Sequence, residues 1–137
     1  SRLLGRPFAI EGNVVHGDAL GRQWGFPTAN VSARRQLIPP SGVYIVYVQY
    51  QGRLFPGMAY IGRKPSIRPS GRITIEVNIF NFNRNIYGEK IIIFFNKKIR
   101  EEIKFDSRHS LVRQIQSDEA NARRWFRRTH LIIPSLI

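Results

Sequence analysis

The chain has 137 residues, 42% of them hydrophobic and 12% aromatic, which indicates a single globular domain with its own core rather than a disordered chain. It contains no cysteine, which excludes disulfides and thiolate metal sites and favours a reducing, cytoplasmic location. No apolar run approaches the roughly 20 residues that span a bilayer, so no membrane partner is expected. The first residues lack the organisation of a signal peptide and do not include Met, which is consistent with a domain excised from a longer protein.

The net charge of +13 is the unusual feature of the composition. Residues 1–96 carry 12 basic and 4 acidic side chains, and residues 97–137 carry 10 and 5, so the excess is spread along the chain. The only local cluster consists of Arg123, Arg124, Arg127 and Arg128. A basic nucleic-acid-binding surface and an ordinary solvated basic surface both fit this pattern, and we expect the second.

Most of the chain has the pattern of β-strands separated by turns. The segments rich in β-branched and aromatic residues are 8–15, about 28–31, 43–50, 53–61, 73–80 and 89–99. Residues 43–50 are apolar on both faces, which predicts a central strand, and Gln51-Gly52 predicts a hairpin turn after it. Residues 34–40 and 63–71 contain prolines and basic residues, which predicts surface loops.

The hydrophobic period changes near the C-terminus. Leu111, Ile115, Ala122 and Phe126 recur at helical spacing, which predicts a helix at about 107–128 that Asp106 or Ser107 caps. Some six or seven strands followed by one helix predict an all-β fold that closes, or nearly closes, into a barrel. We therefore expect one domain over 1–137: a barrel at about 5–104, the helix, and a short apolar tail at 131–137.

A glycine-rich segment stands out from this generic barrel. Gly17, Gly21 and Gly25 are spaced by four, and Arg22 lies among them. Glycines let the backbone approach a ligand closely, and successive N–H groups with an arginine form an anion-binding concavity. Glycine richness alone is a weak signal that favours a plain flexible hairpin, and no P-loop sequence is present.

The run Pro27-Thr28-Ala29-Asn30 follows directly. Proline fixes the entry to a strand, and alternation then places Thr28 and Asn30 on one face. Their hydroxyl and amide oxygens are hard ligands that suit Mg²⁺ bound to a phosphate-bearing substrate. The alternative, that both side chains satisfy backbone groups near a turn, remains open on this pattern alone.

The glycine-rich segment followed by Gly25-Phe26-Pro27-Thr28-Ala29-Asn30 resembles the signature of riboflavin kinases. The resemblance continues in the family's order through five further segments as far as the last helix: Pro40-Ser41-Gly42-Val43-Tyr44, Ala59-Tyr60-Ile61-Gly62, Glu76-Val77-Asn78-Ile79-Phe80, Tyr87-Gly88 and Arg100-Glu101-Glu102-Ile103-Lys104-Phe105-Asp106-Ser107. Tyr60 stands where the family often has Asn. The opening Leu3-Leu4-Gly5-Arg6-Pro7-Phe8 is similar to the start of the kinase half of bacterial bifunctional riboflavin kinase/FAD synthetases.

This resemblance implies a six-stranded antiparallel Greek-key β-barrel with a C-terminal helix, and a kinase that converts riboflavin and ATP to FMN and ADP. It implies that Thr28 and Asn30 serve the magnesium–phosphate site. The residues that it implies around the nucleotide are Gly17, Gly21, Arg22, Gly25, Pro27, Thr28 and Asn30. An adenylyltransferase module upstream is a further implied partner.

Glu76 is also a candidate general base from its position. The chain has nine carboxylates, and Glu76 alone lies in the middle of a strand on a polar face, between Thr74 and Asn78. A general base needs such a rigid mount, although a surface or paired structural acid is the alternative. The resemblance assigns the same residue as catalytic base.

Two other functions remain as alternatives. One is a non-catalytic basic β-barrel that binds RNA or single-stranded DNA through arginines and exposed aromatic side chains. The other is a flavin-binding relic without turnover. We expect no specific nucleic-acid partner.

Overall fold

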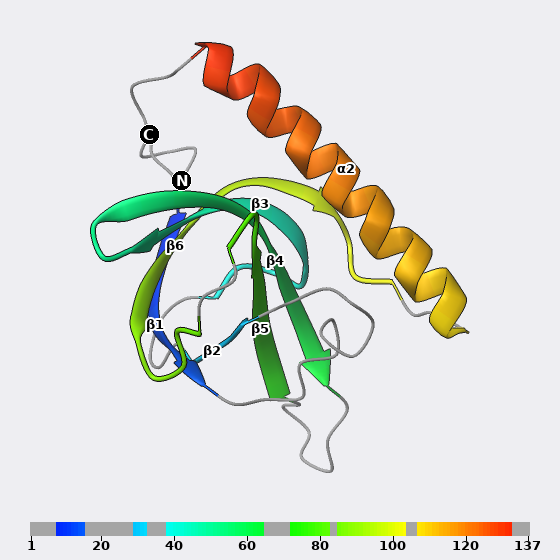
Figure 1. Cartoon of the computed structure of the whole chain (residues 1–137). Coiled ribbons are helices and arrows are strands. Elements are labelled where there is room, and N and C mark those ends of the chain that lie inside the picture. The colour runs from blue at the N-terminus through cyan, green and yellow to red at the C-terminus, as the bar shows by residue number, and fades with distance from the viewer. Residues whose placement is uncertain are drawn as a thin grey trace. The chain divides into compact units, whose positions relative to one another are not determined.

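The computed structural model describes residues 8–15, 29–32, 38–64, 72–82, 85–103 and 107–132. The chain divides into two compact units, residues 1–102 and residues 103–137. The first unit contains the described strands, and the second contains helix α2. In Figure 1 the strands are coloured from blue to yellow-green and helix α2 from yellow to red.

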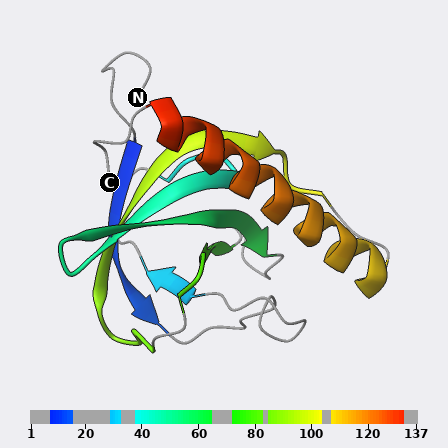
Figure 2. The same cartoon turned by 45° about the horizontal axis from the view of Figure 1, so that its top comes forward.

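The described strands form a closed antiparallel barrel. Their bounds are β1 Phe8–Val15, β2 Ala29–Ser32, β3 Gly42–Tyr50, β4 Arg53–Lys64, β5 Arg72–Ile79 and β6 Lys90–Arg100. The order around the barrel is β1-β2-β5-β4-β3-β6, and β6 closes it by pairing with β1. Figure 2 shows the same strands from a second direction. The predicted six-stranded antiparallel Greek-key barrel is confirmed.

The interior of the barrel holds one hydrophobic cluster. Alternation along each strand turns every second side chain inward. The cluster includes Ile10, Val14, Val31, Tyr44, Val46, Val48, Tyr50, Ala59, Ile61, Ile75, Val77, Ile79, Ile91, Ile93 and Phe95. In β3, every residue except the half-buried Gln49 is buried, and the strand lies between β4 and β6, as the apolar character of residues 43–50 on both faces predicts for a central strand.

The turn between β3 and β4 lies where the sequence predicted it. Gln51 and Gly52 both have positive φ, at 52° and 77°, as a two-residue hairpin with the right-handed twist requires. The turn can be followed at the left of Figures 1 and 2. One boundary was wrong: β4 continues to Lys64, which pairs with Arg72 of β5, so residues 63 and 64 belong to a strand and not to the expected loop. Residues 65–71 of that expected loop lie outside the described residues.

Helix α2 spans Arg108–Ile132 and is therefore longer than the predicted 107–128. Ser107 caps it, since its Oγ accepts a hydrogen bond from the Ser110 N–H at 3.1 Å. Ile115 and Ala122 are buried, as their spacing predicts. Asp118 falls on the same stripe and is also fully buried, with Gln114 Nε2 donating to its Oδ1 at 3.0 Å. No helix within the described ranges is long and apolar enough to cross a bilayer.

Candidate functional site

Three side chains lie side by side on the outer face of the barrel. Asn30 of β2 pairs directly with Glu76 of β5, and Glu76 pairs on its other side with Tyr60 of β4. Residues directly opposite in an antiparallel pair project to the same face. The neighbours of Glu76 along its strand, Ile75 and Val77, belong to the core. The row Asn30–Glu76–Tyr60 therefore faces outward.

Glu76 is mounted rigidly, as a general base requires. Its strand is hydrogen-bonded on both sides, to β2 and to β4, so the direction of its Cα–Cβ bond is fixed by two ladders. Glu76 is half-buried on this face. The prediction that Glu76 lies mid-strand on the outward face is confirmed, while its catalytic role stays a prediction.

The outward face around Glu76 is less exposed than the alternation of β5 indicates. Thr74 and Glu76 are half-buried, and Asn78 is only 5% exposed. On β4, Met58 lies opposite Asn78 and is fully buried. Glu76 therefore lies at the boundary between an accessible region and a packed one.

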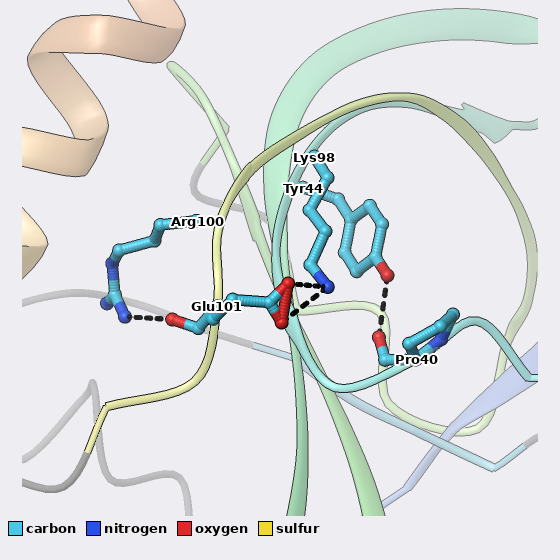
Figure 3. A network of polar contacts seen from close by, with 5 residues as sticks. All are labelled: Pro40, Tyr44, Lys98, Arg100 and Glu101. Carbon is cyan, nitrogen blue, oxygen red and sulfur yellow. Dashed lines mark hydrogen bonds and ion pairs between the residues drawn. The ribbon is translucent and has the colours of Figure 1, made fainter.

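A network of polar contacts holds the end of β6 (Figure 3). Lys98 Nζ donates to Glu101 Oε2 at 2.9 Å, and Arg100 Nη1 donates to the Glu101 carbonyl oxygen at 3.0 Å. Lys98 Nζ also lies 5.9 Å from the centre of the Tyr44 ring, whose hydroxyl donates to the Pro40 carbonyl oxygen at 2.6 Å. The hydrogen bond that Lys98 donates to Glu101 raises the pKa of Lys98, and burial raises the pKa of Tyr44. These contacts fix the course of residues 98–101.

Gly42 of β3 allows the end of β6 to lie close to the start of β3. It has φ +148°, and a Cβ there would lie 2.6 Å from Lys98 Cε and 2.7 Å from the Arg100 carbonyl oxygen. Any larger residue at position 42 would push this segment away.

Gly62 of β4 likewise leaves room for Glu102, which follows the end of β6. A Cβ at position 62 would lie 2.8 Å from Glu102 Oε2 and 3.7 Å from Thr74 Oγ1. Gly62 pairs with Thr74, which is the outward residue next to Glu76 along β5. The Glu102 carboxylate therefore lies against the outward face in the row adjacent to Asn30–Glu76–Tyr60. No strand or helix pattern in the sequence indicates this position for Glu102, because it follows the end of β6.

Most of the expected nucleotide-binding residues lie outside the described residues. These are Gly17, Gly21, Arg22, Gly25, Pro27 and Thr28. Asn30 is described, and its pairing with Glu76 brings together one member of the expected magnesium–phosphate set and the expected base. Among the described residues, no group of three or more His, Asp and Glu side chains gathers in one place.

Exposed aromatic side chains are scarce on the described barrel. Tyr87, at 52%, is the one aromatic among the exposed large hydrophobic residues of the described ranges. A barrel that binds single strands without a catalytic role needs several such rings to stack against bases. The described surface therefore gives this alternative no support.

The family comparison matches nearly the whole chain. Residues 4–126 match the family model described as Flavokinase: Riboflavin kinase. A bifunctional riboflavin kinase/FMN adenylyltransferase of Escherichia coli K12 is 48% identical over 125 residues, which cover 90% of this chain and 40% of that protein. The chain thus spans about two fifths of the length of the curated relatives that it matches.

Two solved structures share the fold. Riboflavin kinase from Trypanosoma brucei superimposes with a TM-score of 0.65 at 25% identity, covering 93% of this chain and 85% of that one. A protein from Streptococcus pneumoniae described as a macrolide-efflux protein superimposes with a TM-score of 0.83 at 42% identity. The match covers 90% of this chain and 41% of the pneumococcal one.

Proposed function

The chain belongs to the riboflavin kinase (flavokinase) family, and we therefore propose that it transfers the γ-phosphate of ATP to the primary hydroxyl of riboflavin. The products are FMN and ADP. The observation that supports this proposal is the direct pairing of Asn30 with Glu76 on the outward face of the barrel. It places an amide oxygen, which is a hard metal ligand, next to a carboxylate. Neither this pair nor the family match relates to transport, the role that the description of the pneumococcal protein names.

In the proposed reaction, Glu76 acts on the acceptor hydroxyl. The hydroxyl oxygen forms a bond to the γ-phosphorus, the bond from that phosphorus to the β,γ-bridging oxygen breaks, and ADP leaves with the bonding electrons. The hydroxyl proton passes to the Glu76 carboxylate as the new bond forms. Phosphoryl transfer depends mostly on positioning and charge neutralisation, so the two ladders that fix Glu76 matter as much as its basicity.

The residues present fit a bound Mg²⁺. Asn30 offers an amide oxygen on the face of Glu76, and Thr28, two residues earlier, would add a hydroxyl oxygen. Thr28, Asn30 and the nucleotide phosphates would hold such an ion, which would supply positive charge to offset the negative charge of the transferred group. Asn30 itself would orient the phosphate end of ATP toward the hydroxyl beside Glu76.

The remaining nucleotide contacts are proposed from the family resemblance. Gly17, Gly21, Gly25 and Pro27 would shape a backbone cradle for the phosphates, and Arg22 would add a charge to it. The net charge of +13 would then act as a general attractive field for ATP, with no specific nucleic-acid partner.

An adenylyltransferase module is the proposed covalent partner. The relatives that the chain matches carry both activities, and this chain matches about two fifths of their length. The proposed activity of this chain by itself ends at FMN. The cytoplasmic location expected from the composition stays a prediction.

The proposed function is tested first by turnover. The protein is mixed with riboflavin and Mg-ATP, and FMN is measured by chromatography. Glu76→Gln keeps the shape of the side chain and removes its charge, so we expect kcat to fall about 10²-fold or more with riboflavin and Mg-ATP binding little changed. Glu11→Gln is the matched control, because Glu11 is a surface acid of β1 paired with Lys90 at 3.3 Å. Turnover of Glu76→Gln at the parent rate would place the base elsewhere.

The magnesium assignment has a separate test. Thr28→Ala removes one hydroxyl, and we expect it to abolish Mg-ADP binding measured by calorimetry while the thermal melting curve stays close to that of the parent. Parent-like affinity for Mg-ADP would exclude Thr28 from the site.

A further inference from the structure

The segment that follows β6 brings a second carboxylate to the face of Glu76. Glu102 Oε2 lies 2.8 Å from the position that a Cβ of residue 62 would occupy, so the carboxylate rests on the bare backbone of Gly62. Gly62 pairs with Thr74, and Tyr60 pairs with Glu76, which makes these adjacent outward rows. Outward residues on one strand are separated by about 7 Å, twice the rise per residue. Glu102 is therefore a neighbour of the proposed base.

Contacts of the neighbouring residues limit the position of Glu102. Glu101, its predecessor, is held by Lys98 at 2.9 Å and by Arg100 at 3.0 Å. Thr74 Oγ1 in turn lies 3.4 Å from the Gly62 carbonyl oxygen, which orients that hydroxyl on the same face. Glu102 is nevertheless exposed, so its carboxylate is available to a ligand on this face.

We propose that Glu102 is a specificity-determining residue of the riboflavin site, a role that rests on the proposed function. The flavin substrate carries a chain of hydroxyl groups, of which only the terminal one reacts beside Glu76. A carboxylate accepts hydrogen bonds from neutral hydroxyls, and such charge-assisted bonds are stronger than neutral ones. Glu102 would therefore bind the hydroxyls that do not react.

The same charge would act against the product. A phosphomonoester carries about −1.5 to −2 charges at neutral pH. Two carboxylates in adjacent rows repel that charge, since like charges placed together across an interface disfavour binding. Glu102 would thus favour riboflavin over FMN and assist product release, while Gly62 is kept free of a side chain so that the carboxylate can reach the face.

The experiment measures dissociation constants of riboflavin and of FMN for the full chain by flavin fluorescence, at low salt. In Glu102→Gln we expect riboflavin to bind about tenfold more weakly, because a charged acceptor becomes a neutral one. FMN loses the same hydrogen bonds but also loses the repulsion. The ratio of the FMN constant to the riboflavin constant should therefore fall by about threefold or more.

Gly62→Ala provides an independent perturbation of the same contact. The added methyl would displace the Glu102 carboxylate, so this variant should lower the same ratio. The double variant should lower the ratio no further than the single variants do, because the effects of two residues in contact are not additive. Glu11→Gln removes one surface carboxylate outside the site and should leave the ratio unchanged. An unchanged ratio in Glu102→Gln, whose fold is checked by thermal melting, would overturn the proposal even if Gly62→Ala failed to fold.

The result for Glu102 can be distinguished from the result of the test for FMN formation. If the parent chain forms FMN from riboflavin and Mg-ATP and the ratio is unchanged in Glu102→Gln, only the role of Glu102 is refuted. If the parent chain forms no FMN, the proposed function fails, and with it the role assigned to Glu102.

Discussion

Gly57 is the position at which a single added methyl group should separate two strands of the site. It pairs with Ile79 in the β4–β5 ladder, and a Cβ there would lie 2.4 Å from the Asn78 carbonyl oxygen and 3.3 Å from the Ile79 Cα. The first distance is about 1 Å shorter than the separation at which non-bonded heavy atoms pack. Both obstacles are backbone atoms, which cannot turn aside as a side chain can, so β4 and β5 must move apart in Gly57→Ala.

The magnitude follows from two opposing terms. Overpacking costs about 1–3 kcal/mol in well-packed sites, and the upper end applies because the obstacle is backbone in a hydrogen-bonded ladder. Replacing glycine by alanine in a strand returns about 0.5–1 kcal/mol by reducing the freedom of the unfolded chain. We therefore expect the free energy of unfolding to fall by about 2 kcal/mol.

Urea unfolding at equilibrium measures this loss. With a slope of about 2 kcal/mol per M, typical of small domains, the midpoint of unfolding should fall by about 1 M with the slope unchanged. A midpoint equal to or above that of the parent would show that the ladder accommodates the methyl group. The clash expected between the added Cβ and the Asn78 carbonyl oxygen would then be refuted.

Four further predictions concern stability and charge. Gly52→Ala should lower the free energy of unfolding in urea by about 1–2 kcal/mol, because residue 52 has φ +77°, and an added Cβ would meet no atom within 4 Å, so the loss comes from the backbone conformation alone. Gly52→Asn should lower it less, because asparagine tolerates positive φ. Ile93→Ala, in the fully buried core, should cost about 2–5 kcal/mol by the same assay. Burial raises the pKa of Tyr47 above 10.0, so the contribution of its neutral hydroxyl to stability is complete below pH 10.0 and is lost as the pH rises through the folded-state pKa. The melting temperature of the parent should therefore fall in that pH range, and that of Tyr47→Phe should fall less steeply. Binding to an unrelated oligonucleotide should be weak and should disappear steeply with added salt; tight, salt-resistant binding to one sequence would favour the nucleic-acid alternative.

Local pattern was sufficient for the features that depend on a single strand or turn. The alternation of residues 73–80 predicted that Glu76 faces outward, because neighbouring side chains in a strand must project to opposite sides. The apolar run 43–50 predicted a strand buried on both faces, and Gln51-Gly52 predicted the hairpin. Each of these depends on residues that are close together in the sequence.

Pairing between distant strands could not be read from the same pattern. That Asn30 lies directly opposite Glu76 depends on the register of β2 against β5, which no local signal sets. The approach of Glu102 to Gly62 depends likewise on the course of the chain after β6. Asp118 shows a different limit of prediction from the sequence. An aspartate is expected at the surface, but Asp118 lies on the apolar stripe of helix α2 and is fully buried.

The pairing of β1 with β6 has a consequence for how the barrel forms. Phe8 pairs with Phe95, so the wall cannot close until the strand at Lys90–Arg100 has been synthesised and has left the ribosome. Until then β1 has an unpaired edge, and loop-closure entropy opposes every long-range contact that would cover it. The β3–β4 hairpin, in contrast, is joined by two residues and can form early. Folding during synthesis should therefore begin at this hairpin and end with closure at β6.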